Sequence, residues 1–461
     1  MTGSELPNLL DYHDNDHGNA ERLIALYGSD LRFCHALRKW LVWDGKRWAV
    51  DETEHARHLA TKTMLGFLQQ AADLAVDEDN KRRRFAYGSL NARPITNLLR
   101  MAQSEIFVRP TDLDTDPYLL NFVNGTVDLR TGVMHPHRRE DLITRLVRYN
   151  YRPGSRCPRF LTFLTDIVAN DGQMLRYLQR AVGYSLTGCT GEKAVFVLFG
   201  EGNNGKTTLL ATIRKLIEDY AVLLCVDTLM VRQESNNTQA DLADLRGARF
   251  VQTSETESGQ RLAQGKLKRI TQGMGTVKAV RKYENPIEFP ETHKLWMDTN
   301  RKPTITDADD QATFNRLHPI PFSVRIENID RDLPGKLLQE AEGILSWAVA
   351  GAKIWHTEGL GKPPAVEAAN EAWRAESHSL DRFVRDRCLP DGEISGEKFY
   401  QAYQTWAKNR QEKDVLSAQA FGMKMSDWPG VTKSRTKDGI IYVGLKLRGH
   451  RASLLPPKVK V

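Results

Sequence analysis

The sequence predicts a multi-domain α/β protein, and two observations carry this prediction. In the middle of the 461-residue chain, Val195–Phe199 is an apolar run without alternation, which is typical of a strand buried on both faces of a parallel sheet. Helical and strand patterns alternate around this run, as they do in three-layer α/β domains. We therefore expect a mixed α+β N-terminal domain over residues 1–155, a central three-layer α/β domain over 156–355, and a linker with a winged-helix domain and a basic tail over 356–461.

Short strands and one long helix are expected in the N-terminal domain. Alternating apolar residues on both sides of Asp44-Gly45 predict a hairpin, because Asp-Gly supplies the positive φ that a tight turn needs. Apolar residues at helical spacing predict a helix over residues 55–76. Residues 118–134 predict two short strands around Asn124-Gly125 and Thr131-Gly132.

Helices and strands then follow one another to the C-terminus. Two amphipathic helices are expected between residues 160 and 187, and a linker is expected at Gly359–Pro364, where two glycines and two prolines cannot continue a helix. Buried strands are expected at 195–199, 249–252 and 293–297; helices at 208–217, 397–409 and 417–428; and a final hairpin at 431–436 and 440–447. Helix, helix and basic hairpin is the order of a winged helix.

Composition excludes several classes of protein. There are 65 Lys and Arg against 58 Asp and Glu, and 41% hydrophobic with 27% charged residues is a globular mixture, not that of a disordered chain. No apolar run approaches the roughly 18 residues of a membrane span, and residues 1–19 contain no apolar signal core. The five cysteines lie far apart, without zinc-ligand spacing. We expect a soluble protein with reduced thiols and no membrane partner.

A phosphate-binding pattern follows the first buried strand of the central domain. Eight consecutive residues match G-x-x-x-x-G-K-[ST]: Gly200, Glu201, Gly202, Asn203, Asn204, Gly205, Lys206 and Thr207. The glycines let backbone N–H groups turn toward a phosphate, Lys206 reaches the β- and γ-phosphates, and Thr207 offers its hydroxyl to Mg²⁺. With Thr208 opening the next helix, the pattern predicts a site for ATP and Mg²⁺. The alternative is a glycine-rich turn without a ligand.

Hydrolysis of a nucleotide needs a carboxylate at the end of a neighbouring strand. Glu255 follows the strand predicted at 249–252 and is the first candidate to hold Mg²⁺ together with Thr207; Glu257 is the second. Both could instead be acids of a surface loop.

Two further residues lie at strand ends. Asn300 follows an apolar strand and could contact the γ-phosphate or the attacking water, or it could simply cap a loop. Arg316 precedes a short apolar strand and could act as an arginine finger on a neighbouring subunit's nucleotide. A core-edge arginine held by a salt bridge is the alternative.

The phosphate-binding pattern at 200–207 is followed in order by Glu255, Asn300 and Arg316. In this order the four motifs closely resemble those of the superfamily 3 helicases, specifically the helicase module of phage and plasmid primase-helicases related to the poxvirus primase-helicase. The resemblance extends to Glu288-Phe289, Thr292–Trp296 and Thr299–Pro303, and loosely to the flanking regions. It implies an AAA+-like P-loop ATPase with Walker A at 200–207, the Walker B acid Glu255, the sensor Asn300 and the finger Arg316. It also implies an ATP-dependent replicative DNA helicase of a phage or mobile element, assembled as a hexameric ring in the bacterial host cytoplasm.

Two basic segments are candidates for contacts with single-stranded and forked DNA. The resemblance implies a helix that carries Lys266 and Lys268, followed by a hairpin with Lys278, Arg281 and Lys282 that tracks single-stranded DNA. In the expected winged helix, the hairpin arm bears Lys433, Arg435 and Lys437. Residues 431–461 hold eight basic side chains and one acidic side chain, so this segment carries the whole net charge of +7. A solvated basic edge and a solvated tail are the alternatives.

The sequence departs from the family pattern at several positions. Asn315 stands where a second arginine is frequent, Gln272–Gly275 lacks an acid, and Asp298 replaces an apolar or small residue.

The first 150 residues show no Asp-x-Asp or zinc-ligand cluster for a primase centre, so a separate primase or replication initiator is the expected partner. A bifunctional primase-helicase and a nucleotide-switched DNA-binding initiator are the rival functions; Glu255 with Asn300 argues against the second.

Overall fold

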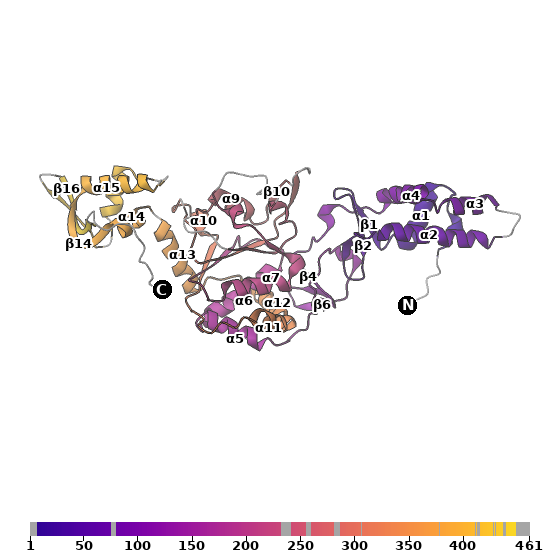
Figure 1. Cartoon of the computed structure of the whole chain (residues 1–461), viewed down its shortest axis with the longest axis horizontal. Coiled ribbons are helices and arrows are strands. Elements are labelled where there is room, and N and C mark those ends of the chain that lie inside the picture. The colour runs from indigo at the N-terminus through magenta and orange to yellow at the C-terminus, as the bar shows by residue number, and fades with distance from the viewer. Residues whose placement is uncertain are drawn as a thin grey trace.

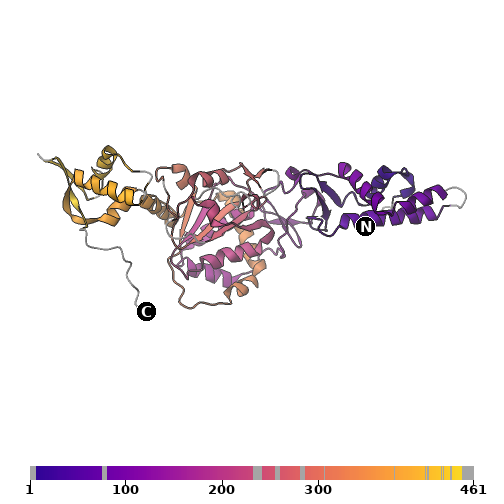
Figure 2. The same cartoon turned by 45° about the horizontal axis from the view of Figure 1, so that its top comes forward.

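The structure is a computed structural model, and it describes residues 7–74, 80–231, 241–254, 260–280, 286–305, 307–377, 379–410, 412, 415–426, 428, 430–436 and 439–448. The molecule is elongated, with a helical N-terminal part at one end, an α/β part in the middle and a small α/β part at the C-terminal end (Figures 1 and 2). The expectation of a multi-domain α/β protein with a mixed N-terminal part is confirmed. No described helix is both long enough and apolar enough to cross a membrane.

Four helices and a small sheet form the N-terminal part. The helices share one buried cluster, and the antiparallel strands pair in the order β1-β2-β3. The helices are α1 (Asp16–Tyr27), α2 (His55–Ala72), α3 (Asn80–Gly88) and α4 (Ala92–Glu105), and the strands are β1 (Leu31–Cys34), β2 (Lys39–Trp43) and β3 (Trp48–Val50). The hairpin predicted around Asp44-Gly45 is β2–β3, and the predicted long helix is α2.

A second antiparallel sheet joins this part to the central one. Three strands, β4 (Leu119–Phe122), β5 (Gly125–Asp128) and β6 (Val133–His135), occupy the stretch where two were predicted. Their buried side chains Leu120, Phe122 and Val127 belong to the same cluster as the helices of the central part. This sheet therefore packs on the central core, although it precedes residue 155.

The central part is built on a five-stranded sheet in the order β13-β7-β12-β9-β8, with all neighbours parallel. Its strands are β7 (Val195–Phe199), β8 (Ala221–Leu223), β9 (Phe250–Ser254), β12 (Lys294–Thr299) and β13 (Leu317–Pro321). Successive residues of a strand point to opposite faces, so Phe196 and Trp296 enter one buried cluster while Val195 and Leu295 enter another. This explains the continuous apolar run of β7 and the apolar run Leu295–Met297 of β12, and it confirms the predicted parallel sheet.

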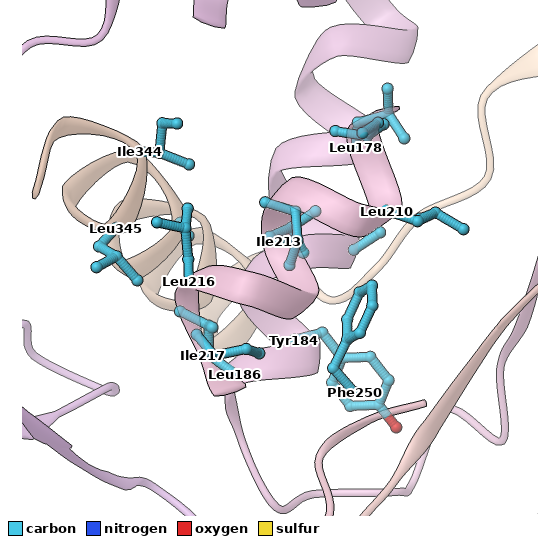
Figure 3. Close-up of a cluster of buried hydrophobic side chains, with 14 of the residues drawn as sticks. Leu178, Tyr184, Leu186, Leu210, Ile213, Leu216, Ile217, Phe250, Ile344 and Leu345 are labelled. Carbon is cyan, nitrogen blue, oxygen red and sulfur yellow. The ribbon is translucent and has the colours of Figure 1, made fainter. Parts of the chain in front are cut away.

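Helices cover both faces of this sheet. One face is covered by α5 (Pro158–Ile167), α6 (Gly172–Leu186), α7 (Lys206–Leu216), α11 (Leu333–Leu338) and α12 (Ala341–Glu358); the other carries α9 (Gln264–Ile270) and α10 (Gln311–Phe314). The helix α13 (Pro364–Ser377) contributes Val366 to the first cluster and Trp373 to the second. Side chains of α6, α7 and α12 interdigitate in the first cluster (Figure 3). Where α6 and α12 cross, a Cβ on Gly183 would lie 2.1 Å from the Ala352 nitrogen, so only glycine permits this approach.

An antiparallel hairpin, β10 (Thr276–Ala279) with β11 (Ile287–Pro290), projects from the central part after α9. It lies where the sequence predicts a DNA-tracking hairpin. Within it, Thr276 pairs with Pro290 and Ala279 with Ile287. Residues 281–285, between the two strands, lie outside the described part of the chain.

The C-terminal part packs helices on a three-stranded antiparallel sheet in the order β14-β16-β15. Its elements are α14 (Ser379–Arg387), β14 (Cys388–Ser395), α15 (Gly396–Asn409), α16 (Ala418–Ser426), β15 (Thr432–Thr436) and β16 (Gly439–Leu447). Aromatic residues such as Phe383, Phe399 and Tyr403 fill the core between helices and sheet. The predicted helices and hairpin are present, whereas β14, α13 and α14 were not predicted. Single-turn 3-10 helices lie at Leu9–Asp11, Pro110–Asp112, Arg139–Asp141, Glu218–Tyr220 and Val226–Leu229.

Candidate functional site

The predicted phosphate loop connects β7 to α7 at the carboxyl edge of the central sheet. Gly200 has φ of 150°, and a Cβ there would lie 2.1 Å from the Phe322 carbonyl oxygen, so a larger residue would collide with the backbone. Gly205 has φ of 84° and precedes the first residue of α7. No described residue accepts a hydrogen bond from the backbone N–H groups of residues 201–205. The loop thus offers free N–H donors beside a helix N-terminus, which suits an anion.

The Lys206 side chain folds over this loop. Its ammonium donates to the Gly200 carbonyl at 2.8 Å and to the Asn204 side-chain oxygen at 2.8 Å, and more weakly to the Asn300 side-chain oxygen at 3.4 Å. Burial lowers the pKa of Lys206, while the nearby Asp298 carboxylate opposes that shift. The structure therefore brings together Lys206 and Asn300, which are 94 positions apart in the sequence.

A hydroxyl and a carboxylate lie next to the lysine. Thr207 Oγ1 donates a hydrogen bond of 2.7 Å to Asp298 Oδ2. Asp298 is on β12 between Leu198 of β7 and Ser254 of β9, and it is only 2% exposed. Its second oxygen, Oδ1, is buried and has no hydrogen-bond partner among the described residues. Hydroxyl and carboxylate oxygens are ligands that Mg²⁺ prefers.

A short segment after β13 closes the other side of the loop. The Phe322 N–H donates to the Phe199 carbonyl at 2.8 Å, and the Ile326 N–H donates to the Asn203 carbonyl at 2.8 Å. Between loop and segment lies a cavity of about 290 Å³, lined by residues 199–202 and 321–325. Together, the free N–H groups, the lysine, the hydroxyl and the buried carboxylate fit a phosphate-bearing ligand with a divalent cation.

The remaining candidates of this edge are Thr208 and the two acids. Thr208 is the third residue of α7, and its carbonyl accepts from the Thr212 hydroxyl. Glu255 and Glu257 lie outside the described residues, so their role stays a prediction. The strand that precedes them, β9, ends at Ser254, which pairs with Asp298.

Arg316 lies at the opposite edge of the sheet. It precedes β13, whose first residue Leu317 pairs with Val195 at the start of β7, whereas the phosphate loop follows the end of β7. Its guanidinium donates to the Thr271 carbonyl at 3.1 Å and to the Ala312 carbonyl at 2.6 Å. The structure therefore does not bring Arg316 to the Lys206 of its own chain.

Three of the candidate DNA-binding residues lie on described strands outside the phosphate loop. Lys278 is on β10 with 79% of its side chain exposed, and it forms a 3.6 Å ion pair with Glu288. On β15, Lys433 and Arg435 are exposed. Arg281, Lys282 and Lys437 lie outside the described residues. Lys268 of α9 forms a 2.7 Å ion pair with Asp310.

Sequence reasoning missed the contribution of Asp298 to this site and noted it only as a departure from the family pattern. The available signal was an acidic residue directly after the apolar run Leu295–Met297 of a predicted strand. A second buried carboxylate, Glu291, precedes β12 at the opposite edge and accepts from the Gln272 and Gly273 N–H groups. Burial raises the pKa of Glu291 to about 7, although these two hydrogen bonds oppose the shift.

Comparison with known proteins finds similarity to viral proteins that are named putative helicases and putative primases. A family model described as "D5 N terminal like" matches residues 20–169, and a "Family of unknown function (DUF5906)" matches residues 198–316. "Putative helicase L207/L206" of Acanthamoeba polyphaga mimivirus is 26% identical over 441 residues and 85% of this chain. "Putative primase C962R" of African swine fever virus is 24% identical over 307 residues and 60% of this chain. The chain is related to the D5-like viral primase-helicases. The resemblance that the motifs indicated is thereby confirmed.

The D5-like relatives are longer proteins. This chain spans 46% of the mimivirus protein and 31% of the African swine fever virus protein, and 41% of "Putative helicase 022R" of Frog virus 3, which is 24% identical over 67% of this chain. Among solved structures, "The A form apo structure of NrS-1 C terminal region-CTR" aligns with 90% of this chain and 95% of its own length. Its TM-score is 0.51 at 11% identity, which shows a shared fold.

Proposed function

We propose that this protein is an ATP-dependent replicative DNA helicase of a phage or mobile element that works as a ring in the bacterial host cytoplasm. The observation that carries the proposal is the cluster of Lys206, Thr207, Asp298 and Asn300 around a loop with free N–H groups. The names of the viral relatives support helicase or primase activity and replication. P-loop, AAA+ and winged-helix are accordingly the names that we propose for the loop, the central part and the C-terminal part.

Each residue of the loop edge has a distinct task in this proposal. Backbone N–H groups of residues 201–205 bind the β-phosphate, and Lys206 leaves its own loop carbonyls to hold the β- and γ-phosphates. Mg²⁺, when bound, neutralises phosphate charge, and Thr207 with Glu255 holds it. Glu255 accepts the proton of the attacking water, and Asn300 orients that water or the γ-phosphate.

The position of Arg316 supports a role between subunits. The strand between Arg316 and the loop edge is five residues long, roughly 17 Å along the backbone rise. An arginine at that distance cannot complete its own site, but it can reach the nucleotide of a neighbour in a closed ring. We propose a hexamer, with Arg316 as the finger that stabilises charge in the transition state.

DNA contacts fall on the hairpin and on the C-terminal part. Lys278, Arg281 and Lys282 are proposed to grip phosphates of single-stranded DNA, and Lys433, Arg435 and Lys437 to contact the duplex of a fork. A separate primase or replication initiator completes the proposal as a partner.

Hydrolysis of ATP stimulated by single-stranded DNA, measured together with strand displacement on forked duplexes, tests the proposal. Wild-type protein should do both, and Lys206→Ala should do neither. A protein that binds ATP and DNA without turnover would favour the nucleotide-switched initiator. Primer synthesis from nucleoside triphosphates would favour the bifunctional primase-helicase.

A further inference from the structure

We propose that Asp298 is a further positioning residue of the divalent-cation site, which orients Thr207 through one carboxylate oxygen and presents the other to the hydrated cation. The inference rests on the proposed nucleotide site and assigns a role to a residue outside its predicted set. It also explains why β12 carries an aspartate directly after the apolar residues Leu295–Met297.

The hydrogen bond between the two side chains decides which atoms are left for the cation. A threonine hydroxyl has one proton and two acceptor lone pairs. In this structure the proton goes to Asp298 Oδ2 at 2.7 Å. The lone pairs of Thr207 Oγ1 are thereby left for a cation, and rotation of the hydroxyl is restricted. Asp298 thus sets the orientation of the predicted ligand.

The second carboxylate oxygen points to the same conclusion. Asp298 is 2% exposed, and its Oδ1 has no hydrogen-bond partner within the described part of the chain. A buried oxygen of a carboxylate without a partner costs free energy. A divalent cation that keeps part of its water shell, as Mg²⁺ does, supplies both positive charge and water donors.

Charge balance for Lys206 is the competing explanation of Asp298. The two groups attract, since Asp298 opposes the lowered pKa of Lys206. However, the ammonium directs its hydrogen bonds to Gly200, Glu201, Asn204 and Asn300 and none to Asp298. Neutralising the charge of Lys206 therefore does not provide Asp298 Oδ1 with a hydrogen-bond partner.

A carboxylate at this position should also couple the nucleotide to the cation. A phosphate that enters the loop without a cation meets the negative charge of Asp298, whereas a cation between them attracts both. Asp298 should therefore weaken metal-free nucleotide binding and strengthen cation binding. These opposite effects distinguish it from a residue that only supports the fold.

The test measures the two affinities separately on the full chain. Mn²⁺ binding to the protein with saturating ADP is followed by electron paramagnetic resonance, and ADP binding is followed by calorimetry with Mg²⁺ or with EDTA. Asp298→Asn keeps the shape and one acceptor oxygen but removes the charge. It should weaken Mn²⁺ binding by roughly 10- to 100-fold, as losses around metal ligands usually do. ADP affinity in EDTA should stay equal or rise.

Controls separate this role from a structural one. Glu291→Gln removes a buried carboxylate at the other edge of the sheet and should leave Mn²⁺ affinity unchanged. Thr207→Val should repeat the Mn²⁺ loss, and it replaces Asp298→Asn if that variant does not fold. Unchanged Mn²⁺ affinity in Asp298→Asn, or an equal loss of ADP affinity with and without Mg²⁺, would overturn the inference. If the wild-type protein bound no ADP in either condition, the proposed function itself would fail.

Discussion

Glu291 makes the stability of the central part depend on pH. Its pKa is raised from 4.5 to about 7 by burial, so between these values the folded protein binds more protons than the unfolded one. The free energy of unfolding should therefore fall as pH rises from 4.5 to 7, and stay level above 7. Glu291→Gln should abolish this pH dependence. Above pH 7 the free energy of unfolding of the variant should exceed that of the wild type by at most about 3 kcal/mol.

Urea unfolding of wild type and Glu291→Gln at several pH values between 4 and 8 measures this difference. Two other groups titrate in the same range, because burial lowers the pKa of His293 and of His318 from 6.5 to about 4. Their contribution to the free energy of unfolding is present above pH 6.5 and is lost as pH falls from 6.5 to 4. The difference between the two proteins isolates Glu291. Parallel curves would show that its proton affinity is the same in both states.

At the residue scale, Lys206, Thr207 and Asn300 could be named as candidates from the sequence because a short motif and a strand end mark them locally. The contact of Asp298 with Thr207 depends on which strand lies beside β7, and nothing near position 298 in the sequence specifies that. The two carbonyl oxygens that hold Arg316 are likewise 45 and four residues away. Side-chain partners of this kind follow only from the fold.

At the scale of the elements, α6 and α12 cross so closely that the backbone of each helix leaves no room for a Cβ on the other helix's glycine at the crossing. A Cβ on Gly351 would lie 2.1 Å from the Gln179 carbonyl oxygen, whereas a Cβ on Gly172, at the start of the same α6, has nothing within 4 Å. Gly351→Ala should therefore destabilise the protein by about 1–3 kcal/mol or more. Gly172→Ala should be neutral or stabilise by up to about 1 kcal/mol. Thermal unfolding of both variants checks this, and equal midpoints would contradict the packing argument.

The β10–β11 hairpin carries the second element-scale prediction. Arg281→Ala with Lys282→Ala should keep basal ATP hydrolysis but lose its stimulation by single-stranded DNA, because fewer phosphates are gripped. The control, Arg57→Ala with Lys62→Ala on exposed positions of α2, removes the same charge from the N-terminal part. Hydrolysis rates against DNA concentration compare the two. Full stimulation in the hairpin variant would leave the C-terminal part as the proposed DNA contact.

Which elements could be predicted depends on how local their signals are. The strands β7, β9 and β12 of the central sheet contain apolar residues on both faces because both faces are buried, and they were predicted from that pattern, whereas the short strand β8 was not predicted. In contrast, β14 contains Pro390, Asp391 and Gly392, residues that disfavour strands, and its register shifts between Pro390 and Glu393. It forms because β16 offers it hydrogen-bond partners, and that information lies some 50 residues away.

At the scale of the whole molecule, the trans role of Arg316 makes a prediction about mixed assemblies. Arg316→Ala should lose hydrolysis by on the order of 10³-fold while still binding ATP and DNA. Lys206→Ala should be equally inactive. Mixing the two variants should restore part of the activity, because an intact loop can then face an intact arginine of its neighbour. Hydrolysis is measured against mixing ratio, with mixed assemblies verified by native mass spectrometry; verified mixtures without recovery would contradict a finger in trans.

The opposite positions of the loop and Arg316 on parallel strands have an arithmetic consequence. On the proposed function, a working centre belongs to a boundary between chains and not to a chain. An open row of n chains then has n − 1 centres, whereas a closed circle of the same chains has n. Closing the circle adds a complete centre without adding any protein. Turnover per chain should therefore increase with protein concentration, and it should increase once more when an open row closes into a ring.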